Sequence, residues 1–446
     1  MDSTDIQREL FETFMESQYW PREQIEEYQR KRLQRLLRHA RSHVPFYRDR
    51  LAGVVDDSGR VDWSQWDKIP ILTRADLVSH GREIESTALP TGHGAIIRSA
   101  TSGSTGVPLS VAMSVYANIA SQAALHRGQS WHELDWSKDV LFYTEERPES
   151  GVWPSVEIGN AWGPPWMEAA TGRFLRFNGD TPPPNILAYL AEHGRVAYLS
   201  CRAKVAQVLA LESERLHEPA KLSAVFAFST AAHDDEREDI RRAFGAKVLS
   251  LYSSKEAHMM GYQCPHGDHL HINEEIVRIE LLDEDGTPVP PGTIGRVVVT
   301  NLFNWAQPII RYAQDDLAIE GERCVCGRTL RVLSKVIGRV TDMFRFPDGT
   351  SVAFALPENI KRELRIKSWQ VAQVGPLEIE VRYAPDTGDG GIDESALATA
   401  VRRRSHPDIR VTFRRTTDFI PSDGGKFAEY INEFARGLRR DRASAG

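Results

Sequence analysis

A strand–helix–strand pattern between Ala224 and Ser253 constrains the fold of this chain more than any other feature. Ala224–Thr230 (AVFAFST) and Lys247–Ser253 (KVLSLYS) are short apolar runs typical of buried strands, and the charged stretch His233–Phe244 between them has helical spacing. Lys138–Thr144 (KDVLFYT) adds another buried strand. Strand, helix and strand at this spacing form a βαβ unit, so the sequence predicts a mostly parallel sheet.

Two later stretches predict smaller units. Within Glu275–Leu302, two alternating runs flank an EDG turn and a connection rich in Pro and Gly, which is typical of antiparallel strands in a small β subdomain. Farther on, Glu378–Ala384 and Ile409–Arg415 alternate like strands, and Asp393–Arg404 between them has helical spacing. These elements predict an α+β unit of about 100 residues, a usual size for a small domain.

The length of the chain requires more than one core. At 446 residues it exceeds what one ordinary core holds, so we expect two domains. We place an N-terminal domain at 1–338, which opens with amphipathic helices in Ile6–Leu51, and a C-terminal domain at 339–446. The predicted class is α/β, with a large N-terminal domain of βαβ parallel sheets and a small β subdomain, and a small α+β C-terminal domain.

Composition and charge exclude several classes of function. The net charge of −7 argues against a nucleic-acid-binding surface, because such surfaces are usually basic. No run of about 18 apolar residues is present, so we expect no membrane span. The N-terminal segment is acidic and lacks the apolar stretch of a secretory signal, and four cysteines in a chain of this length form no disulfide framework. We therefore expect a cytoplasmic protein.

The segment Thr101–Gly106 (TSGSTG) predicts a phosphate-binding loop. Its glycines leave backbone N–H groups free to close around phosphate oxygens, and its hydroxyls add donors. It is not a Walker A loop, because no Gly-Lys-Ser/Thr follows. By itself, such a loop is also typical of a plain surface turn, so the interpretation depends on other motifs.

Four such motifs follow along the chain. YSSKEA (Tyr252–Ala257) ends a predicted strand, where open α/β sheets bind ligands, and PIIRYAQDD (Pro308–Asp316) brings Arg, Tyr and carboxylates together. IGRVTDMF (Ile337–Phe344) stands at the proposed domain boundary, and IPSDGGKF (Ile420–Phe427) puts a lysine on a glycine-rich loop. Each motif alone is weak, but their order and spacing together are specific.

With these five motifs in this order, the chain resembles the adenylate-forming superfamily of acyl-CoA synthetases, luciferases and peptide-synthetase adenylation domains. The branch that it resembles is that of the phenylacetate–CoA ligases, over about residues 40 to 435. The resemblance implies that a carboxylate attacks the α-phosphate of ATP and gives an acyl-adenylate and pyrophosphate. It also implies that the small C-terminal domain is mobile and rotates about Thr341–Asp342 between the two half-reactions.

The resemblance assigns roles to residues of each motif. Glu256 would bind Mg²⁺, a hard cation that takes carboxylate and phosphate oxygens, and Lys426 would stabilise charge on the α-phosphate. Tyr252 would flank the nucleotide, Asp316 would accept hydrogen bonds from the ribose hydroxyls, and Arg339 would lie near the phosphate. The further residues that it would place at the nucleotide are Thr101, Ser102, Gly103, Ser104, Thr105, Gly106, Ser229 and Ser253.

The chain departs from the motifs of this superfamily in several places. Ser253 and Asp315 stand where glycines are usual, and Ser229–Thr230 replaces the Gly-Glu pair of the adenine-binding loop. Thr341 occupies the first acidic position of the hinge, which leaves Asp342 as the nearest carboxylate. ATP binding is still the prediction.

The cysteines predict a structural zinc site in an insert around 264–326. Three thiols, Cys264, Cys324 and Cys326, with one histidine form a common Zn²⁺ set, although a one-residue gap between cysteines is tighter than usual. His271 is our choice of fourth ligand by position, with His269 and His266 as alternatives. Some members of the resembled family carry the same pattern. The competing interpretation is that these histidines are surface residues of a polar loop; Cys201 is left as a buried core thiol.

The acid pocket is the least determined part. The aromatic residues where the resembled family builds its acid-binding wall are Trp131, Tyr143, Trp162 and Trp166. They also suit a core, but as a wall they favour a flat aryl acid over a long acyl chain.

We therefore expect an ATP-dependent, AMP-forming aryl acid ligase with coenzyme A as acceptor. The enzyme alternatives pass the acyl group to an amine, a hydroxyl or a carrier protein, or activate a small inorganic acid such as nitrite. A nucleotide-binding regulatory subunit without turnover is the alternative of another class, against which Lys426 and Glu256 argue. A homodimer is one assembly that we considered.

Overall fold

The computed structural model of the protein describes residues 2–100, 109–144, 151–217, 220–228, 232, 234–339, 343–354, 356, 358–385, 392–416, 419 and 429–434. By its internal contacts the chain divides into two compact units. Unit 1 consists of Met1–Ser99, Ser110–Gln314 and Ala318–Val336, and unit 2 of Ala100–Leu109, Asp315–Leu317 and Ile337–Gly446. The domain boundary after residue 338 stays a prediction, and unit 2 also takes in two short segments from earlier in the chain.

Amphipathic spacing accounts for the longest helix of unit 1, and a polar N-cap starts several of the others. In the longest helix, Ile25, Leu33, Leu36 and Leu37 recur on one buried face, and in the first, the Asp2 side chain accepts the Asp5 N–H as N-cap. The helices are α1 (Ser3–Ser17), α2 (Arg22–His43), α3 (Tyr47–Arg50), η1 (Trp63–Lys68), α4 (Arg74–Ser79), α5 (Val115–Ser130), η2 (Pro165–Ala170), α6 (Pro183–Glu192), α7 (Ala203–Leu216) and α8 (Asp234–Phe244).

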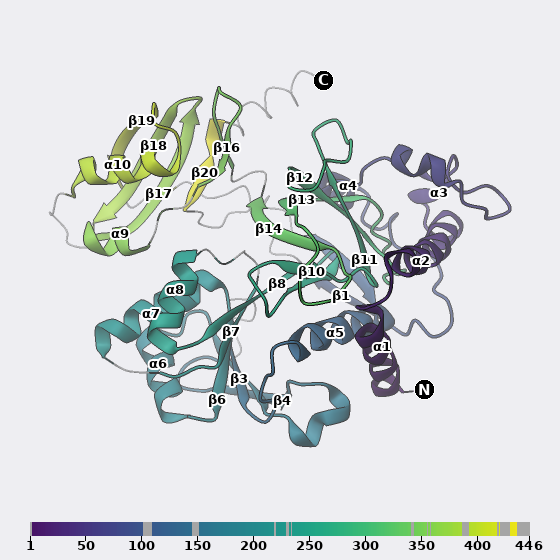
Figure 1. Ribbon diagram of the computed structural model, residues 1–446, viewed down its shortest axis with the longest axis horizontal. Helices are drawn as coiled ribbons and strands as arrows, with labels where there is room; N and C mark the ends of the chain where they lie inside the picture. Colours follow the sequence, from purple (N-terminus) through teal and green to yellow (C-terminus); the bar gives the residue numbers. More distant parts are fainter. Residues whose placement is uncertain are drawn as a thin grey trace. The chain divides into compact units, whose positions relative to one another are not determined.

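One half of the main sheet is parallel, as the sequence predicts. Strands β3, β5, β6, β7 and β8 pair in parallel, and β4 pairs with β5 in antiparallel orientation at the edge. Figure 1 shows α6, α7 and α8 beside these strands, and their apolar faces share one core with the sheet. The strands are β3 (Asp139–Thr144), β4 (Glu157–Ala161), β5 (Arg173–Asn178), β6 (Val196–Cys201), β7 (Ala224–Ala227) and β8 (Lys247–Ser254).

In the other half of the sheet, the pairs β8–β9, β9–β10, β10–β14 and β11–β12 are antiparallel. The twelve strands run in the order β11-β12-β13-β14-β10-β9-β8-β7-β6-β3-β5-β4, and the orientation changes between β8 and β9. The two alternating runs in Glu275–Leu302 pair as expected, with Val277 opposite Asn301. The strands are β9 (His258–Gln263), β10 (Leu270–Ile272), β11 (Val277–Leu282), β12 (Ile294–Asn301), β13 (Tyr312–Glu320) and β14 (Val332–Arg339), with β1 (Ile96–Ala100) and β2 (Ser110–Ser114) in a separate pair.

Unit 2 contains the predicted α+β elements. Its four strands run in the order β19-β18-β17-β20, and Trp369, fully buried, lies in their core. The helix expected over Asp393–Arg404 forms with Asp393 as its N-cap. The elements are β15 (Met343–Arg345), β16 (Ser351–Ala353), α9 (Glu358–Glu363), β17 (Ile366–Gly375), β18 (Glu378–Pro385), α10 (Glu394–Arg404), β19 (Arg410–Arg415) and β20 (Tyr430–Asn432). The predicted α/β class, with a large and a small part, is confirmed.

In the part of the chain that the structure describes, no helix combines the length and the apolar character that crossing a bilayer requires.

Candidate functional site

The YSSKE motif forms the carboxyl end of β8, the last of the parallel strands, and the start of the turn that follows it. The turn is fixed from two sides, because the Ala257 N–H donates to Ser254 Oγ at 2.9 Å and Asn301 Nδ2 donates to the Ala257 carbonyl at 2.9 Å. Glu256 stands in this turn and is only 6% exposed. A buried carboxyl group is therefore held where open α/β sheets bind their ligands.

Two side chains from distant parts of the sequence meet the Glu256 carboxyl group. The hydroxyl of Tyr312, the first residue of β13, lies 3.5 Å from Glu256 Oε1, and a guanidinium nitrogen of Arg74 lies 3.7 Å from the same oxygen. The Arg74 side chain is 16% exposed and that of Glu256 8%, so the pair is largely shielded from water. A carboxylate of this kind can hold a hard divalent cation together with phosphate oxygens.

Arg74 did not figure among the site residues predicted from the sequence. It reaches Glu256 because Leu72 pairs in parallel with Tyr312 through the bonds Leu72 N to Arg311 O and Ala313 N to Leu72 O, both 2.9 Å. Helix α4 then starts at Arg74, and Thr73 caps it. The capping pattern marks a helix start in the sequence, but nothing local shows that this start lies beside the YSSKE turn.

The arginine of the RYAQDD motif, Arg311, is buried and binds backbone carbonyls just before the segment that leads to Arg74. Arg311 is 2% exposed, and one guanidinium nitrogen donates to the Asp67 carbonyl at 2.7 Å and the Ile69 carbonyl at 2.9 Å. The other terminal nitrogen pairs with Glu280 at 3.2 Å. Arg311 thus fixes the end of η1, and through it the path of the chain to Arg74.

Several predicted site residues lie outside the described part of the chain. They are Thr101, Ser102, Gly103, Ser104, Thr105, Gly106, Ser229, Thr341, Asp342 and Lys426. The backbone of Arg339 ends β14, but its side chain is not described. The roles expected for these residues stay predictions.

The four aromatic residues expected at the acid wall all have packing partners in unit 1. Trp131 donates its indole N–H to Gln18 at 2.8 Å, and Trp162 stacks on Trp136 at 4.7 Å. The Tyr143 hydroxyl donates to the Thr181 carbonyl at 2.6 Å, and Trp166 packs on Phe11 at 5.2 Å. These contacts are those of a core, and a role in acid binding stays a prediction.

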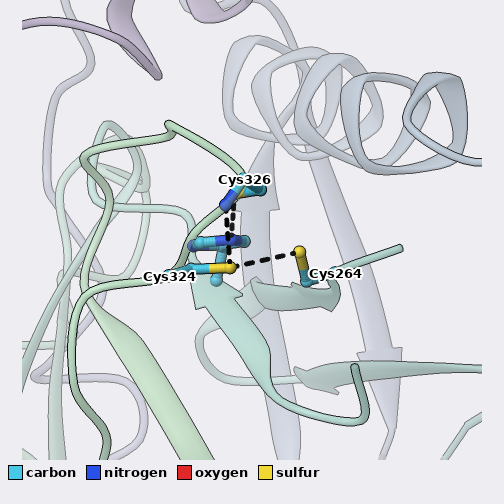
Figure 2. Close-up of side chains that lie close together, drawn as sticks. Cys264, Cys324 and Cys326 are labelled. Carbon is cyan, nitrogen blue, oxygen red and sulfur yellow. Dashed lines mark hydrogen bonds between the residues drawn. The ribbon is translucent and has the colours of Figure 1, made fainter. Parts of the chain in front are cut away.

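A second group of candidate residues gathers where the end of β9, the strand β10 and the segment after β13 come together. One ligand atom each of Cys264, His271, Cys324 and Cys326 lies within 4.8 Å of the other three. Figure 2 shows the Cys324 sulfur in contact with both Cys264 and Cys326: it lies 3.7 Å from the Cys264 sulfur and accepts the Cys326 backbone N–H at 3.4 Å. Three soft thiols and an imidazole at this spacing suit tetrahedral Zn²⁺.

The three candidate histidines of this loop differ in position. His271 is fully buried on β10, and its Nε2 lies 3.2 Å from the Cys326 sulfur. His269 is half-buried, with Nε2 3.1 Å from the Cys324 sulfur but outside the four-atom group, and His266 is exposed. Since β10 alternates, His271 faces the cysteines while Leu270 packs away from them.

The protonation chemistry of the group fits a metal. Burial lowers the pKa of His271 to about 4, so the ring is neutral near pH 7 and has a lone pair for a cation. Burial raises the pKa of the Cys264 thiol to about 12. At Cys326, burial opposes the thiolate, but hydrogen bonds from Arg328, together with those from the Cys324 and Cys264 thiols, outweigh it and the pKa falls below its ordinary value. A bound cation would offset the cost of the buried Cys264 thiolate.

The chain is similar to known ligases over most of its length. It is 28% identical to the phenylacetate-coenzyme A ligase of Thermus thermophilus, in an alignment that covers 92% of this chain and 97% of that protein. This similarity supports the resemblance to the phenylacetate–CoA ligase-like branch of the adenylate-forming superfamily. No family model matches the chain.

Solved structures of adenylate-forming enzymes share the fold. A 2-hydroxyisobutyryl-CoA ligase in its postadenylation state superposes with a TM-score of 0.66 at 19% identity, over 93% of this chain and 91% of that one. An anthranilate CoA ligase bound to anthranoyl-AMP superposes with a TM-score of 0.53 at 15% identity, over 81% of this chain and 70% of that one.

Two residues stand where the motifs of the resembled superfamily have glycine, and the structure shows the backbone at each. Asp315 replaces a motif glycine and has φ +61°, a left-handed conformation that strains most residues with a Cβ. Ser253 replaces the other, at a register shift between β8 and β9 that falls between Tyr252 and Ser253. The backbone thus keeps the shape that glycine would favour at Asp315, next to the ribose-binding candidate Asp316.

Proposed function

We propose that this protein is an ATP-dependent, AMP-forming acid–coenzyme A ligase. The observation that carries the proposal is the buried Glu256 carboxyl group in the YSSKE turn, in a chain that is similar over almost its full length to a phenylacetate-coenzyme A ligase. The reaction has two halves. A carboxylate oxygen first attacks the α-phosphorus of ATP and pyrophosphate leaves; the thiol of coenzyme A then attacks the acyl carbon and AMP leaves.

The protein contributes positioning and charge neutralisation to the first half. A carboxylate is a poor electrophile, and the phosphates of ATP repel it, so the two must be held in line and their charge reduced. We assign the phosphates to the loop Thr101–Gly106, the α-phosphate to Lys426, the ribose hydroxyls to Asp316 and the face of the nucleotide to Tyr252. Arg339 lies near the phosphates in this assignment, and Ser229 and Ser253 line the nucleotide.

Glu256 is the residue that would hold Mg²⁺. When bound with ATP, Mg²⁺ supplies charge neutralisation at the phosphate oxygens. The side chains around the carboxyl group fit this role, because the Tyr312 hydroxyl and Arg74 both approach Oε1 and keep Glu256 in one orientation. Arg74 provides positive charge at the same place, and we assign it to positioning Glu256.

Cys264, His271, Cys324 and Cys326 would hold a structural Zn²⁺. Four protein ligands leave no position for a water, so such a metal would organise the fold rather than react. Around it, the Arg328 guanidinium lies 4.4 Å from the Trp131 ring and donates to Gln18 Oε1 at 3.0 Å. The metal would thereby stabilise the contact between the cysteine loop and the end of α1.

The proposal also names a class of acid substrate and an acyl acceptor. We propose an aryl acid as the substrate. Two observations support this choice: the similar ligase from Thermus thermophilus is named for phenylacetate, and the sequence offers four aromatic residues for the wall of an acid pocket, Trp131, Tyr143, Trp162 and Trp166. Coenzyme A is the acceptor that we favour over an amine, a hydroxyl or a carrier protein. A homodimer stays a prediction.

One assay tests the function. Pyrophosphate release should be measured over a panel of aryl and aliphatic acids, with and without coenzyme A, with Glu256→Gln as the matched inactive control. We expect release that depends on an aryl acid and is fastest with coenzyme A. Release that is independent of acid, or equal in Glu256→Gln, would contradict the proposal.

A further inference from the structure

Two sulfur atoms of the cysteine cluster lie almost in contact. The Cys264 and Cys324 sulfurs are 3.7 Å apart, although the residues come from different segments, one directly after β9 and one after β13. A disulfide bond is about 2 Å long, so each sulfur would move by less than about 1 Å to form one. Side-chain torsions can supply such a shift without a large backbone movement.

The cluster can also be reached from the surface. Cys264 and Cys326 line a surface cleft of about 760 Å³ that lies between α8 and the loop after β9. Cys324 lines a second hollow of about 260 Å³, and the residue beside it, Val325, is 89% exposed. A small oxidant therefore has a route to Cys324, which is half-buried, whereas Cys264 is only 1% exposed.

We propose that Cys324 and Cys264 form a modification site, at which a hydroperoxide oxidises the two thiolates to a disulfide and releases the metal. The release of metal rests on the zinc site proposed above; the formation of the disulfide requires only the two sulfurs. The solvent exposure of the two side chains sets the order of reaction, because a thiol that the oxidant can reach is oxidised first. Cys324 reacts first and Cys264 resolves.

The chemistry balances with hydrogen peroxide as the oxidant. The Cys324 thiolate attacks one oxygen, an S–O bond forms, the O–O bond breaks, and the departing hydroxide takes a proton and leaves as water. The Cys264 sulfur then attacks the Cys324 sulfur, an S–S bond forms and the S–O bond breaks. The departing hydroxide takes a proton, which comes from the Cys264 thiol itself where no metal holds that residue as a thiolate, and leaves as water. Two electrons pass from the sulfur pair to the peroxide. Because disulfide sulfurs are no longer thiolates, the cation loses two of its four ligands.

The consequence falls on the scaffold of the nucleotide site. Cys264 directly follows β9, which pairs with the Tyr252 strand β8, and Cys324 follows β13, which carries Asp316. With a metal, four ligands tie these segments and β10 together; with a disulfide, His271 and Cys326 are released. Oxidation should therefore loosen the fold around the loops and remain reversible by a thiol reductant.

The test uses the full-length protein and titrates it with hydrogen peroxide. Mass spectrometry of the unreduced digest should show Cys264 joined to Cys324, with the loss of one zinc ion per cross-link to a colour-forming chelator and a lower melting temperature. Dithiothreitol and zinc together should restore all three. Cys201, fully buried, is the internal control and should stay a free thiol.

Two variants keep the outcomes distinct. Cys264→Ala should abolish the cross-link and leave Cys324 as a sulfenic acid that a dimedone probe labels, whereas Cys326→Ser should still form the cross-link. If the purified protein contains no zinc, the proposed metal site is wrong. The peroxide titration would still test the Cys264–Cys324 cross-link in that protein. A dominant Cys324–Cys326 cross-link, or peroxide-treated protein that keeps its zinc and its Cys264 thiol, would overturn the inference.

Discussion

Replacing Arg311 by methionine tests whether the arginine of the RYAQDD motif acts on the fold rather than on the nucleotide. The side chain is 2% exposed, donates to the carbonyls of Asp67 and Ile69, and pairs with Glu280. Methionine keeps much of the volume but removes the charge and every donor. The Glu280 carboxyl group, 9% exposed, would then stand against a neutral side chain.

The structure sets the size of the effect. Removing one partner of a buried ion pair costs about 3–5 kcal/mol, because the remaining charge stays buried. Arg278 also interacts electrostatically with Glu280, and the Trp66 indole N–H donates to the same carboxyl group at 3.2 Å. These partners remain in the variant, so we expect the lower end, about 3 kcal/mol. At about 2 °C for each kcal/mol in a large domain, the melting temperature should fall by ~6 °C.

The assay is thermal unfolding combined with ATP-dependent kinetics at low temperature. Arg311→Met should melt earlier while its KM for ATP stays near that of the wild-type protein. Adding Glu280→Gln should recover part of the melting temperature, because the second change removes the buried carboxylate that has lost its ion pair with Arg311. An unchanged melting temperature with a much higher KM for ATP would refute the reasoning and place Arg311 at the nucleotide.

Three further predictions concern other parts of the chain. Asp315→Gly should raise the free energy of unfolding by about 0.5–1 kcal/mol and Asp315→Val should lower it, as urea unfolding will show, because φ is +61° at this residue. Burial lowers the pKa of His126 to about 4, so its contribution is complete above pH 6.5 and lost as the pH falls toward 4; His126→Gln should flatten that decline in unfolding free energy, and an unchanged slope would contradict it. Lys426→Ala should slow acid-dependent pyrophosphate release by on the order of 10²-fold and spare transfer from a supplied acyl-adenylate; equal loss in both steps would remove the assignment.

The fold could be predicted where local pattern decides it. Strands β7 and β8 are short apolar runs, and the charged segment between them has the helical spacing of α8. This strand–helix–strand pattern predicted the parallel pairing of β7 with β8. The helix over Glu394–Arg404 was equally visible, because Asp393 supplies a cap at its start.

The sequence indicated which residues belong to the candidate site, but not which distant side chains lie next to them. Glu256 stood out as the carboxylate of a motif, whereas Arg74 comes to it only because Leu72 pairs with Tyr312 across the fold. Likewise, the cysteines suggested a metal, but three histidines competed for the fourth position. The pairing of β10 with β9 and β14 is what turns His271 toward the sulfurs, and such long-range pairing has no local signal.

The most direct test of adenylation follows an oxygen atom. An acid substrate labelled with ¹⁸O in both carboxylate oxygens should be turned over with ATP and coenzyme A, and the nucleotide product examined by mass spectrometry. If the carboxylate attacks the α-phosphorus, one labelled oxygen remains on the phosphate when the thiol displaces it, so the label should appear in AMP and be absent from pyrophosphate. Label in inorganic phosphate, with ADP as the nucleotide product, would contradict the account.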